Sequence, residues 1–256
     1  MKKYQCFYCV WLMMLFFYSC KDTAVIQRSE PADQKVVEER LQIEENLLKE
    51  KEIAQKKKDL EERYRIKIAG LDTISDSDFV NIEEYSGDFM LDMKYATPDN
   101  FLKEAVYDCA KCYIRVPVAK ALLKANDTLM KLGYRLRFFD CYRPYSVQKK
   151  MWKIFPNPGY VADPKGGSIH NKGAAVDISL VTLDGSSIDM GTEFDFFGKE
   201  AHHSYTKLSA EVLAHRKLLK TIMENHGFKT IRTEWWHYNF TAGRKFRISD
   251  FRWECE

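Results

Sequence analysis

Residues 168–177 read SIHNKGAAVD, and this stretch predicts a turn that runs directly into a buried strand. Residues 171–173 have the composition of a turn, and the mostly apolar residues 174–181 are typical of a strand. Residues seven positions apart on a regular strand point to opposite faces, so His170 and Asp177 meet only if the turn folds the imidazole back over the strand. We therefore expect an imidazole and a carboxylate in one cleft.

Residues 234–237 read EWWH and supply a second imidazole, with a carboxylate three positions before it. Glu234 and His237 would lie on opposite faces of a regular strand, so a bulge or a strand end is needed to bring both into one cleft. Taken singly, a histidine in apolar surroundings is more often a satisfied core residue than a ligand, and Asp177 can merely cap a turn. Together, two imidazoles and a carboxylate are the ligands of a catalytic zinc that keeps its fourth position open for water. The two stretches thus outline a hydrolytic zinc site.

The chain from residue 71 to residue 256 alternates short strands with helices. Strand patterns lie at residues 89–95, 134–139, 174–181 and 234–240, and helical patterns lie at residues 117–132, 146–155 and 209–227. Ser146 and Ser209 are expected to cap their helices. With 45% hydrophobic residues, the chain can bury a packed core. The mixture predicts an α+β fold in which helices pack on one mainly antiparallel sheet that carries the zinc site.

Residues 1–20 resemble an export signal, because Lys2 and Lys3 precede an apolar run over residues 4–18, which is followed by Ser19-Cys20. At about fifteen residues the run is short for a spanning helix, which needs roughly 20, but suits a signal segment. A small residue before Cys20 resembles the lipobox of bacterial lipoproteins, which predicts lipidation there and a membrane anchor. An uncleaved signal anchor is the alternative. Either way the folded part is expected outside the cytoplasm, in the periplasm or at the cell surface.

Residues 21–70 are expected to form a polar linker and then a charged helix over residues 33–68. Favourable i,i+4 pairs are Glu45 with Lys49, Glu52 with Lys56, and Glu61 with Arg65. The apolar stripe is thin, so the segment predicts a solvated stalk that reaches roughly 50 Å and ends at Gly70. A coiled coil is the alternative, although three consecutive lysines at residues 56–58 interrupt its seam.

The cysteines outside the signal give no clear motif. Cys109 and Cys112 have the spacing of half a zinc ribbon, but no second pair follows. In an exported protein we expect them to form a local disulfide or to stay as buried thiols. Cys141 is expected to be packed rather than nucleophilic, because no catalytic histidine is indicated beside it.

Jointly, the two stretches resemble the signature of the D-alanyl-D-alanine dipeptidases, a family of zinc peptidases. The pattern Ser-x-His-x-x-Gly-x-Ala-x-Asp falls on residues 168–177, and Glu-x-Trp-His falls on residues 234–237. Further segments that look like the same family, in the same order, are residues 92–101, 140–144, 189–195 and 202–203. The resemblance covers roughly residues 78–253 and none of the signal or stalk.

The resemblance implies a role for each residue that matches the motifs. His170, Asp177 and His237 would bind one zinc ion, Glu234 would be the catalytic acid/base, and Arg143 would stabilise the transition state. These roles are chemically consistent, because zinc lowers the pKa of its water toward about 7 and a nearby carboxylate can take the proton.

The same resemblance implies the substrate. Asp195 would accept the ammonium group of a small dipeptide, and Ser168 would help to hold that dipeptide near the metal. The implied activity is hydrolysis of D-alanyl-D-alanine to free D-alanine, linked to peptidoglycan metabolism.

Other functions remain open from the sequence. One is a D,D-carboxypeptidase or peptidoglycan endopeptidase of the same superfamily, which would need an open groove. Another is a non-catalytic cell-wall-binding lipoprotein, against which the intact Glu234 and Arg143 argue. The 40 basic and 37 acidic residues are interspersed, so no nucleic-acid surface is expected. The sequence leaves the oligomeric state open.

Overall fold

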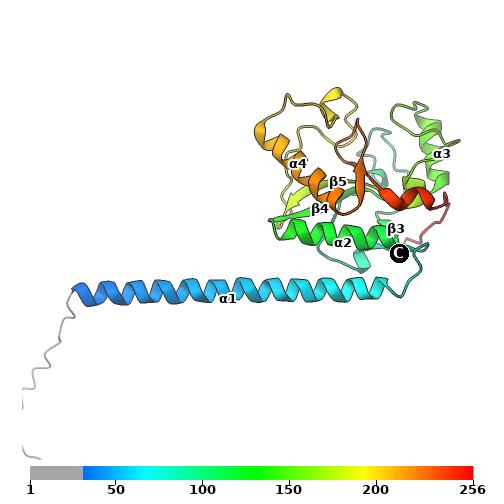
Figure 1. The fold of residues 1–256 in the computed structure, drawn as a ribbon. Coiled ribbons are helices and arrows are strands. Elements are labelled where there is room, and N and C mark those ends of the chain that lie inside the picture. Colours follow the sequence, from blue (N-terminus) through cyan, green and yellow to red (C-terminus); the bar gives the residue numbers. More distant parts are fainter. Residues whose placement is uncertain (1–30, 256) are drawn as a thin grey trace, which may run out of the picture. The chain divides into compact units, whose positions relative to one another are not determined.

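The computed structural model describes residues 31–255 of the chain (Figure 1). The chain divides into two compact units, Met1–Ala54 and Gln55–Glu256, and the division falls inside helix α1 (Pro31–Leu71). The predicted signal segment and the predicted lipidation site Cys20 lie outside the described residues. Within the described part, no helix is both long and apolar enough to cross a membrane.

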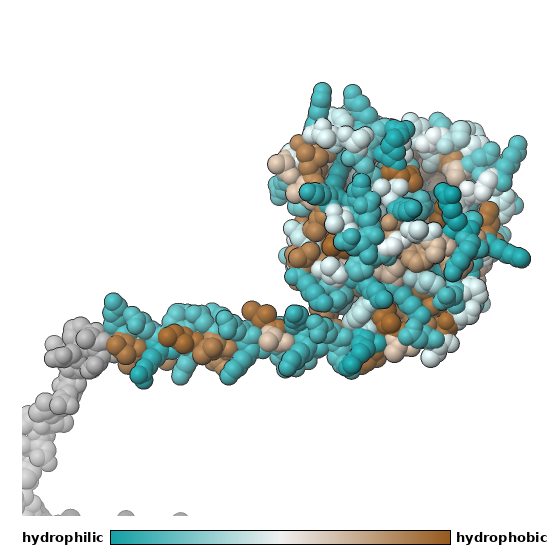
Figure 2. Space-filling model, viewed as in Figure 1, coloured by the Kyte–Doolittle hydropathy of each residue, from teal (hydrophilic) through white to brown (hydrophobic). Residues whose placement is uncertain are grey.

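Helix α1 matches the predicted charged helix closely, but it continues past Gly70 to Leu71. Lys49 pairs with Glu45 at 2.6 Å, as expected, whereas Arg65 pairs with Glu62 and not with Glu61. Figure 2 shows apolar side chains scattered among hydrophilic ones along this helix. The exposed large apolar residues of α1 are Val36, Val37, Leu41, Ile43, Leu47, Leu48, Ile53 and Ile66.

The second unit is built around a five-stranded sheet in the order β2-β4-β5-β7-β6. These strands are β2 (Met90–Leu91), β4 (Tyr134–Asp140), β5 (Ala175–Thr182), β6 (Phe228–Thr230) and β7 (His237–Phe240). Strand β2 runs parallel to β4, while the other neighbours are antiparallel. The sheet is therefore mixed, which corrects the prediction of a mainly antiparallel sheet. A parallel pair needs a long crossover, and the chain between β2 and β4 supplies one.

Two helices cover one face of this sheet (Figure 1). Helices α2 (Val116–Met130) and α4 (Ala210–Asn225) contact each other, and they pack on the central strands. The strand residues Leu136, Ile178 and Leu180 are fully buried. Because strand residues alternate between faces, Asp177 and Ser179 point to the opposite face. The mixed α+β architecture thus leaves one face of the sheet free to carry polar groups.

The remaining elements are short. They are the paired strands β1 (Phe79–Asn81) and β3 (Tyr113–Arg115), helix α3 (Tyr145–Ile154), and the 3₁₀ helices η1 (Ile82–Glu84), η2 (Lys94–Ala96), η3 (His170–Lys172), η4 (Lys199–Ala201) and η5 (Thr241–Lys245).

Several predicted boundaries differ from the structure for local reasons. The strand expected over residues 89–95 is shorter, because the chain turns into η2. Helix α3 begins at Tyr145, so Ser146 lies inside it and does not cap it. Ser209, in contrast, caps α4 as predicted, and its hydroxyl accepts a hydrogen bond from the backbone N–H of Val212 at 3.2 Å.

Two disulfides join distant parts of the second unit. Cys109 pairs with Cys255, and Cys112 pairs with Cys141. The expectation of a local disulfide between Cys109 and Cys112, or of two buried thiols, is therefore wrong. The two cysteines lie on a segment that runs between the C-terminal tail and the end of β4, so each finds a different partner. Cys141 is fully buried, as predicted.

Candidate active site

Three potential metal ligands converge on the polar face of the sheet. His170 starts η3, while Asp177 on β5 is paired directly with His237 on β7. Gly173 ends η3 at a φ of 68°, a left-handed conformation that favours glycine and turns the chain into β5. The ligand atoms of the three side chains lie within 4.8 Å of one another, and all three residues are buried. The geometry anticipated for the turn at residues 171–173 is therefore present.

The outward hydrogen bonds of both imidazoles fix how their rings face the cluster. His170 Nδ1 lies 2.6 Å from the carbonyl oxygen of Cys141, and His237 Nε2 lies 3.0 Å from Oδ1 of Asn239. Both partners only accept, so these two nitrogens carry the hydrogens. His170 Nε2 and His237 Nδ1 then face each other, at 3.2 Å.

Asp177 completes this set of inward-facing atoms. Its Oδ1 lies 2.9 Å from His237 Nδ1 and 3.5 Å from His170 Nε2. Burial would raise the pKa of Asp177, but the two imidazoles hold it well below its usual range. One positive charge among His170 Nε2, His237 Nδ1 and Asp177 Oδ1 would give all three atoms a partner. That charge is either a proton on His237 or a metal ion bound by all three atoms. The residues thus fit a zinc ion.

Glu234 lies just before β7, which begins at His237, so a strand end brings the two side chains into one cleft. Glu234 Oε2 is 3.9 Å from His237 Nδ1. Burial raises the pKa of Glu234, and His237 opposes this shift. A carboxylate whose pKa is raised toward neutrality can exchange a proton during a reaction.

Arg143 is buried and held rigidly. Its Nε and Nη2 donate to Oδ2 of Asp140 at 3.1 and 2.6 Å, and its Nη1 donates to Oε1 of Gln148 at 3.0 Å. The other oxygen of Asp140 accepts from the hydroxyl of Tyr107 at 2.6 Å. Burial would lower the pKa of Arg143, but Asp140 raises it well above its ordinary value. The guanidinium is therefore charged and fixed in orientation.

Asp195 lies on the loop between β5 and α4 and has a φ of 58°, which is rare for a residue other than glycine. Its Oδ2 accepts a hydrogen bond from the hydroxyl of Tyr95 at 3.0 Å. Burial raises the pKa of Asp195 well above its ordinary value, and the charge of Asp177 raises it further. The charged form of this carboxyl group is therefore disfavoured until a cation comes close.

Ser168 has a structural hydrogen bond as well as a place at the site. Its Oγ accepts from the backbone N–H of His170 at 3.2 Å and so supports the turn of η3. The hydroxyl hydrogen is still available as a donor.

One cavity of about 360 Å³ brings the predicted site residues together. Those in its lining are Arg143, Ser168, His170, Asp177, Asp195, Glu234 and His237. Aromatic side chains supply much of the rest, namely Tyr95, Tyr160, Phe197 and Trp236. The structure thus shows the proximity of these side chains, while their catalytic roles stay predictions.

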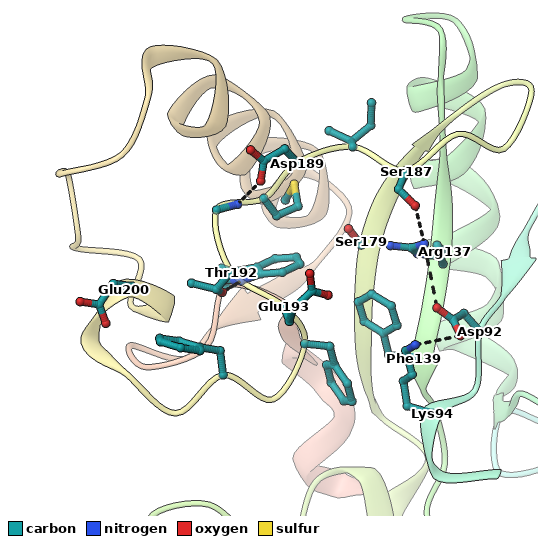
Figure 3. A pocket seen from close by; sticks show the side chains of 16 residues that line it. Asp92, Lys94, Arg137, Phe139, Ser179, Ser187, Asp189, Thr192, Glu193 and Glu200 are labelled. Carbon is teal, nitrogen blue, oxygen red and sulfur yellow. Dashed lines mark hydrogen bonds and ion pairs between the residues drawn. The ribbon is translucent and has the colours of Figure 1, made fainter. Parts of the chain in front are cut away.

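A larger cavity of about 760 Å³ lies on the same face of the sheet (Figure 3). Figure 3 shows Glu193 and Glu200 on its loop side and Arg137 on its sheet side. Its lining contains none of the three clustered ligands, which form the one such group found in residues 31–255. Phe194 lines this cavity, whereas the next residue, Asp195, lines the smaller one. A single loop segment therefore separates the two cavities.

The sequence reasoning missed the residues that hold the predicted ones in place. Asp140 is fully buried three positions before Arg143, and Asn239 follows His237 by two, on the same side of β7. Asn171 Nδ2 donates to the Arg143 carbonyl at 2.8 Å and so joins η3 to the end of β4. The available signal for these supporting residues was their closeness in the sequence to predicted site residues, combined with their carboxylate or amide side chains.

Comparisons with known proteins agree with the geometry. A family model described as "D-ala-D-ala dipeptidase" matches residues 75–251. The chain is 30% identical to the D-alanyl-D-alanine dipeptidase of Escherichia coli (strain K12) over 179 residues, which are 70% of this chain and 93% of that protein. It is 33% identical to the D-alanyl-D-alanine dipeptidase of Enterococcus faecium over 184 residues, which are 62% of this chain and 90% of that protein.

Solved structures show a weaker similarity. The vancomycin-resistance D,D-pentapeptidase VanY, in a complex with Zn(II), aligns with 18% identity and a TM-score of 0.34. The alignment covers 52% of this chain and 75% of that one. This overlap is too low to establish a common fold.

Proposed function

We propose that this chain, which belongs to the D-alanyl-D-alanine dipeptidase family of metallopeptidases, hydrolyses D-alanyl-D-alanine with one zinc ion held by His170, Asp177 and His237. One observation carries this proposal. Both imidazoles give their outer N–H groups to protein oxygens, so their inner nitrogens and a carboxylate oxygen converge on one point. The family acts in peptidoglycan metabolism, and its members are enzymes.

Zinc would supply a Lewis acid and a bound water of lowered pKa. Glu234 would take a proton from the attacking water, which its closeness to His237 and its raised pKa support. The same carboxyl group then delivers this proton to the departing amine.

Arg143 would stabilise negative charge on the substrate carbonyl oxygen. Asp140 and Gln148 use three of its N–H groups, and a guanidinium has five. The other two are available to the substrate. Because the guanidinium is already fixed, little reorganisation is needed when charge develops in the transition state.

Asp195 supports a free dipeptide as the substrate. Asp195 is half-buried and lines a small cavity, where desolvation disfavours its charged form. A substrate ammonium group close to this carboxyl group would offset that cost. N-acylated or longer peptides lack this ammonium at the matching position.

We also propose that the enzyme is exported and anchored to a membrane through a lipid on Cys20. The proposal rests on the apolar run before Cys20 and on the two disulfides of the second unit, which are typical of oxidising compartments.

The proposed function is tested with the zinc-loaded protein and three substrates. These are D-Ala-D-Ala, N-acetyl-D-Ala-D-Ala and a pentapeptide stem that ends in D-Ala-D-Ala, with release of D-alanine followed by mass spectrometry. We expect efficient cleavage of the free dipeptide alone. Comparable cleavage of the acetylated dipeptide or of the pentapeptide would replace this proposal with a D,D-carboxypeptidase.

A further inference from the structure

Four consecutive residues at the end of β4 carry several parts of the site. Asp140 holds the guanidinium of Arg143, and the carbonyl of Cys141 accepts the hydrogen bond from His170 Nδ1. The backbone N–H of Arg143 donates to the His170 carbonyl at 3.1 Å. A small shift of residues 140–143 would therefore disturb a proposed metal ligand and the proposed oxyanion donor together.

The sheet gives this segment little support. The register of β4 against β5 shifts between Phe138 and Asp140, and Asp140 is the last residue of β4 that has a strand partner. Beyond Asp140 the chain has left the sheet, so its position must be fixed by other contacts.

The Cys112–Cys141 disulfide supplies a covalent contact at this point. Both cysteines are fully buried. Beside the disulfide, the backbone N–H of Tyr142 donates to the carbonyl of Tyr113 at 2.9 Å. The other end is itself anchored, because the Cys112 carbonyl accepts from the backbone N–H of Ile82 at 3.0 Å.

We propose that the Cys112–Cys141 disulfide is a positioning element of the catalytic site and not only a stabiliser of the fold. It holds the Cys141 carbonyl where it orients His170, and it holds Arg143 toward the cavity. The proposal rests on the proposed function for the roles of His170 and Arg143. It follows that the chain reaches full activity only after this pair of cysteines has been oxidised.

The physical reason lies in the tautomer of His170. When the Cys141 carbonyl is 2.6 Å away, the hydrogen stays on Nδ1 and the lone pair of Nε2 faces Asp177 and His237. Without that acceptor the ring can rotate or carry its hydrogen on Nε2, and either change removes a ligand atom. Losing such an outer partner of a metal ligand costs about 10- to 100-fold in metal affinity or activity.

The second disulfide is a matched control. Cys109 and Cys255 join the C-terminal tail to the same segment of chain, and Cys255 is exposed. Neither residue lines the catalytic cavity. Removing this disulfide should destabilise the protein, while the contacts of Phe251 and Trp253 with Tyr142 should still hold residues 140–143 in place.

The test compares Cys112→Ser/Cys141→Ser with Cys109→Ser/Cys255→Ser in the full chain. Zinc affinity is measured by competition with a chelator, and kcat and KM are measured on D-Ala-D-Ala. Hydrogen exchange of the Tyr142 and Arg143 amides is followed in the zinc-free protein.

For the 112/141 pair we expect zinc affinity and kcat to fall about 10- to 100-fold. KM should change little, because Asp195 and Ser168 lie on other segments, and both amides should exchange faster. The 109/255 pair should match the unmodified protein in all these measurements.

The outcomes separate a positioning role from a structural one. A lower melting temperature with unchanged zinc affinity, kcat and amide exchange would show that the disulfide only stabilises the fold, and would overturn the proposal. If Cys112→Ser/Cys141→Ser does not fold, the same measurements are made on Cys112→Ala/Cys141→Val, whose side chains fill more of the space left by the disulfide. If neither 112/141 variant folds, the disulfide has a general folding role, and this result would also overturn the proposal. An unmodified enzyme that does not cleave the dipeptide would refute the proposed function, while zinc affinity and exchange would still decide this inference.

Discussion

His170 Nε2 lies 3.2 Å from His237 Nδ1, although the two residues are 67 positions apart in the chain. A cation shared by these two ring nitrogens and by Asp177 would stabilise their close approach. We expect bound zinc to stabilise the fold, by about 2.7 kcal/mol when free zinc is 100 times its Kd. Melting curves with excess zinc and with a chelator test this, and equal melting temperatures would contradict it.

Each ligand should be needed for metal binding. His170→Ala, Asp177→Ala and His237→Ala should each lose stoichiometric zinc and activity together, because the site has no ligand to spare. Asn239→Ala should keep the ligand set but weaken zinc binding about 10- to 100-fold, since it removes the acceptor of His237 Nε2. Metal analysis of the purified variants checks both statements, and full zinc content in an alanine variant would exclude that residue as a ligand.

Chemistry and metal binding should separate at Glu234. Glu234→Gln is nearly isosteric, so zinc should remain while kcat falls about 10²- to 10⁴-fold through loss of the general acid/base. Arg143→Lys should also lower kcat, because an ammonium group cannot reproduce the fork held by Asp140. Normal turnover in either zinc-loaded variant would rule out the role given to that residue.

Asp195 should make substrate binding depend on pH. Its pKa is raised in the free enzyme, so below that pKa the carboxyl group is protonated and cannot pair with the substrate ammonium. The KM for D-Ala-D-Ala should therefore rise as the pH falls through this range. Asp195→Asn should raise KM and remove this dependence. A pH profile of KM that is identical in the two proteins would show that Asp195 does not bind the ammonium.

Asp88 should contribute to stability in a pH-dependent way. Burial would raise its pKa, but Lys67 at 3.1 Å and Ser86 lower it below the ordinary value. A folded-state pKa below the unfolded one means that the contribution is present above about pH 4 and is lost as the pH falls through the folded-state pKa. Asp88→Asn should therefore lower the free energy of unfolding by about 1 kcal/mol at neutral pH. Urea unfolding at pH 7 and pH 3 measures the difference in free energy of unfolding between the unmodified protein and Asp88→Asn. This difference should be smaller at pH 3, and an equal difference at both pH values would refute the prediction.

The local sequence predicts those parts of the fold that depend on neighbours in the chain. The turn before β5 follows from residues 171–173, and the start of α4 follows from Ser209. The parallel pairing of β2, in contrast, depends on where the crossover places a strand of two residues. The partners of Cys109 and Cys112 depend on the path of the C-terminal tail and the end of β4. Such long-range relations leave no mark in the spacing of nearby residues.

The same distinction holds within the site. Chemically distinctive side chains such as His170 and Glu234 stand out in the sequence. Supporting groups stand out less. A backbone carbonyl such as that of Cys141 has no sequence signature, and Asp140 is marked only by its closeness to Arg143 in the chain.

One short loop segment divides the two cavities on the polar face of the sheet. Phe194 packs against Phe139 and lines the larger cavity, while Asp195 lines the smaller cavity together with His170, Asp177 and His237. The boundary of the smaller cavity on this side is therefore formed by a loop that carries none of the clustered ligands. Enzymes that share this chemistry could evolve to accept longer peptides by remodelling this loop, with the three clustered ligands and the residues that support them left intact.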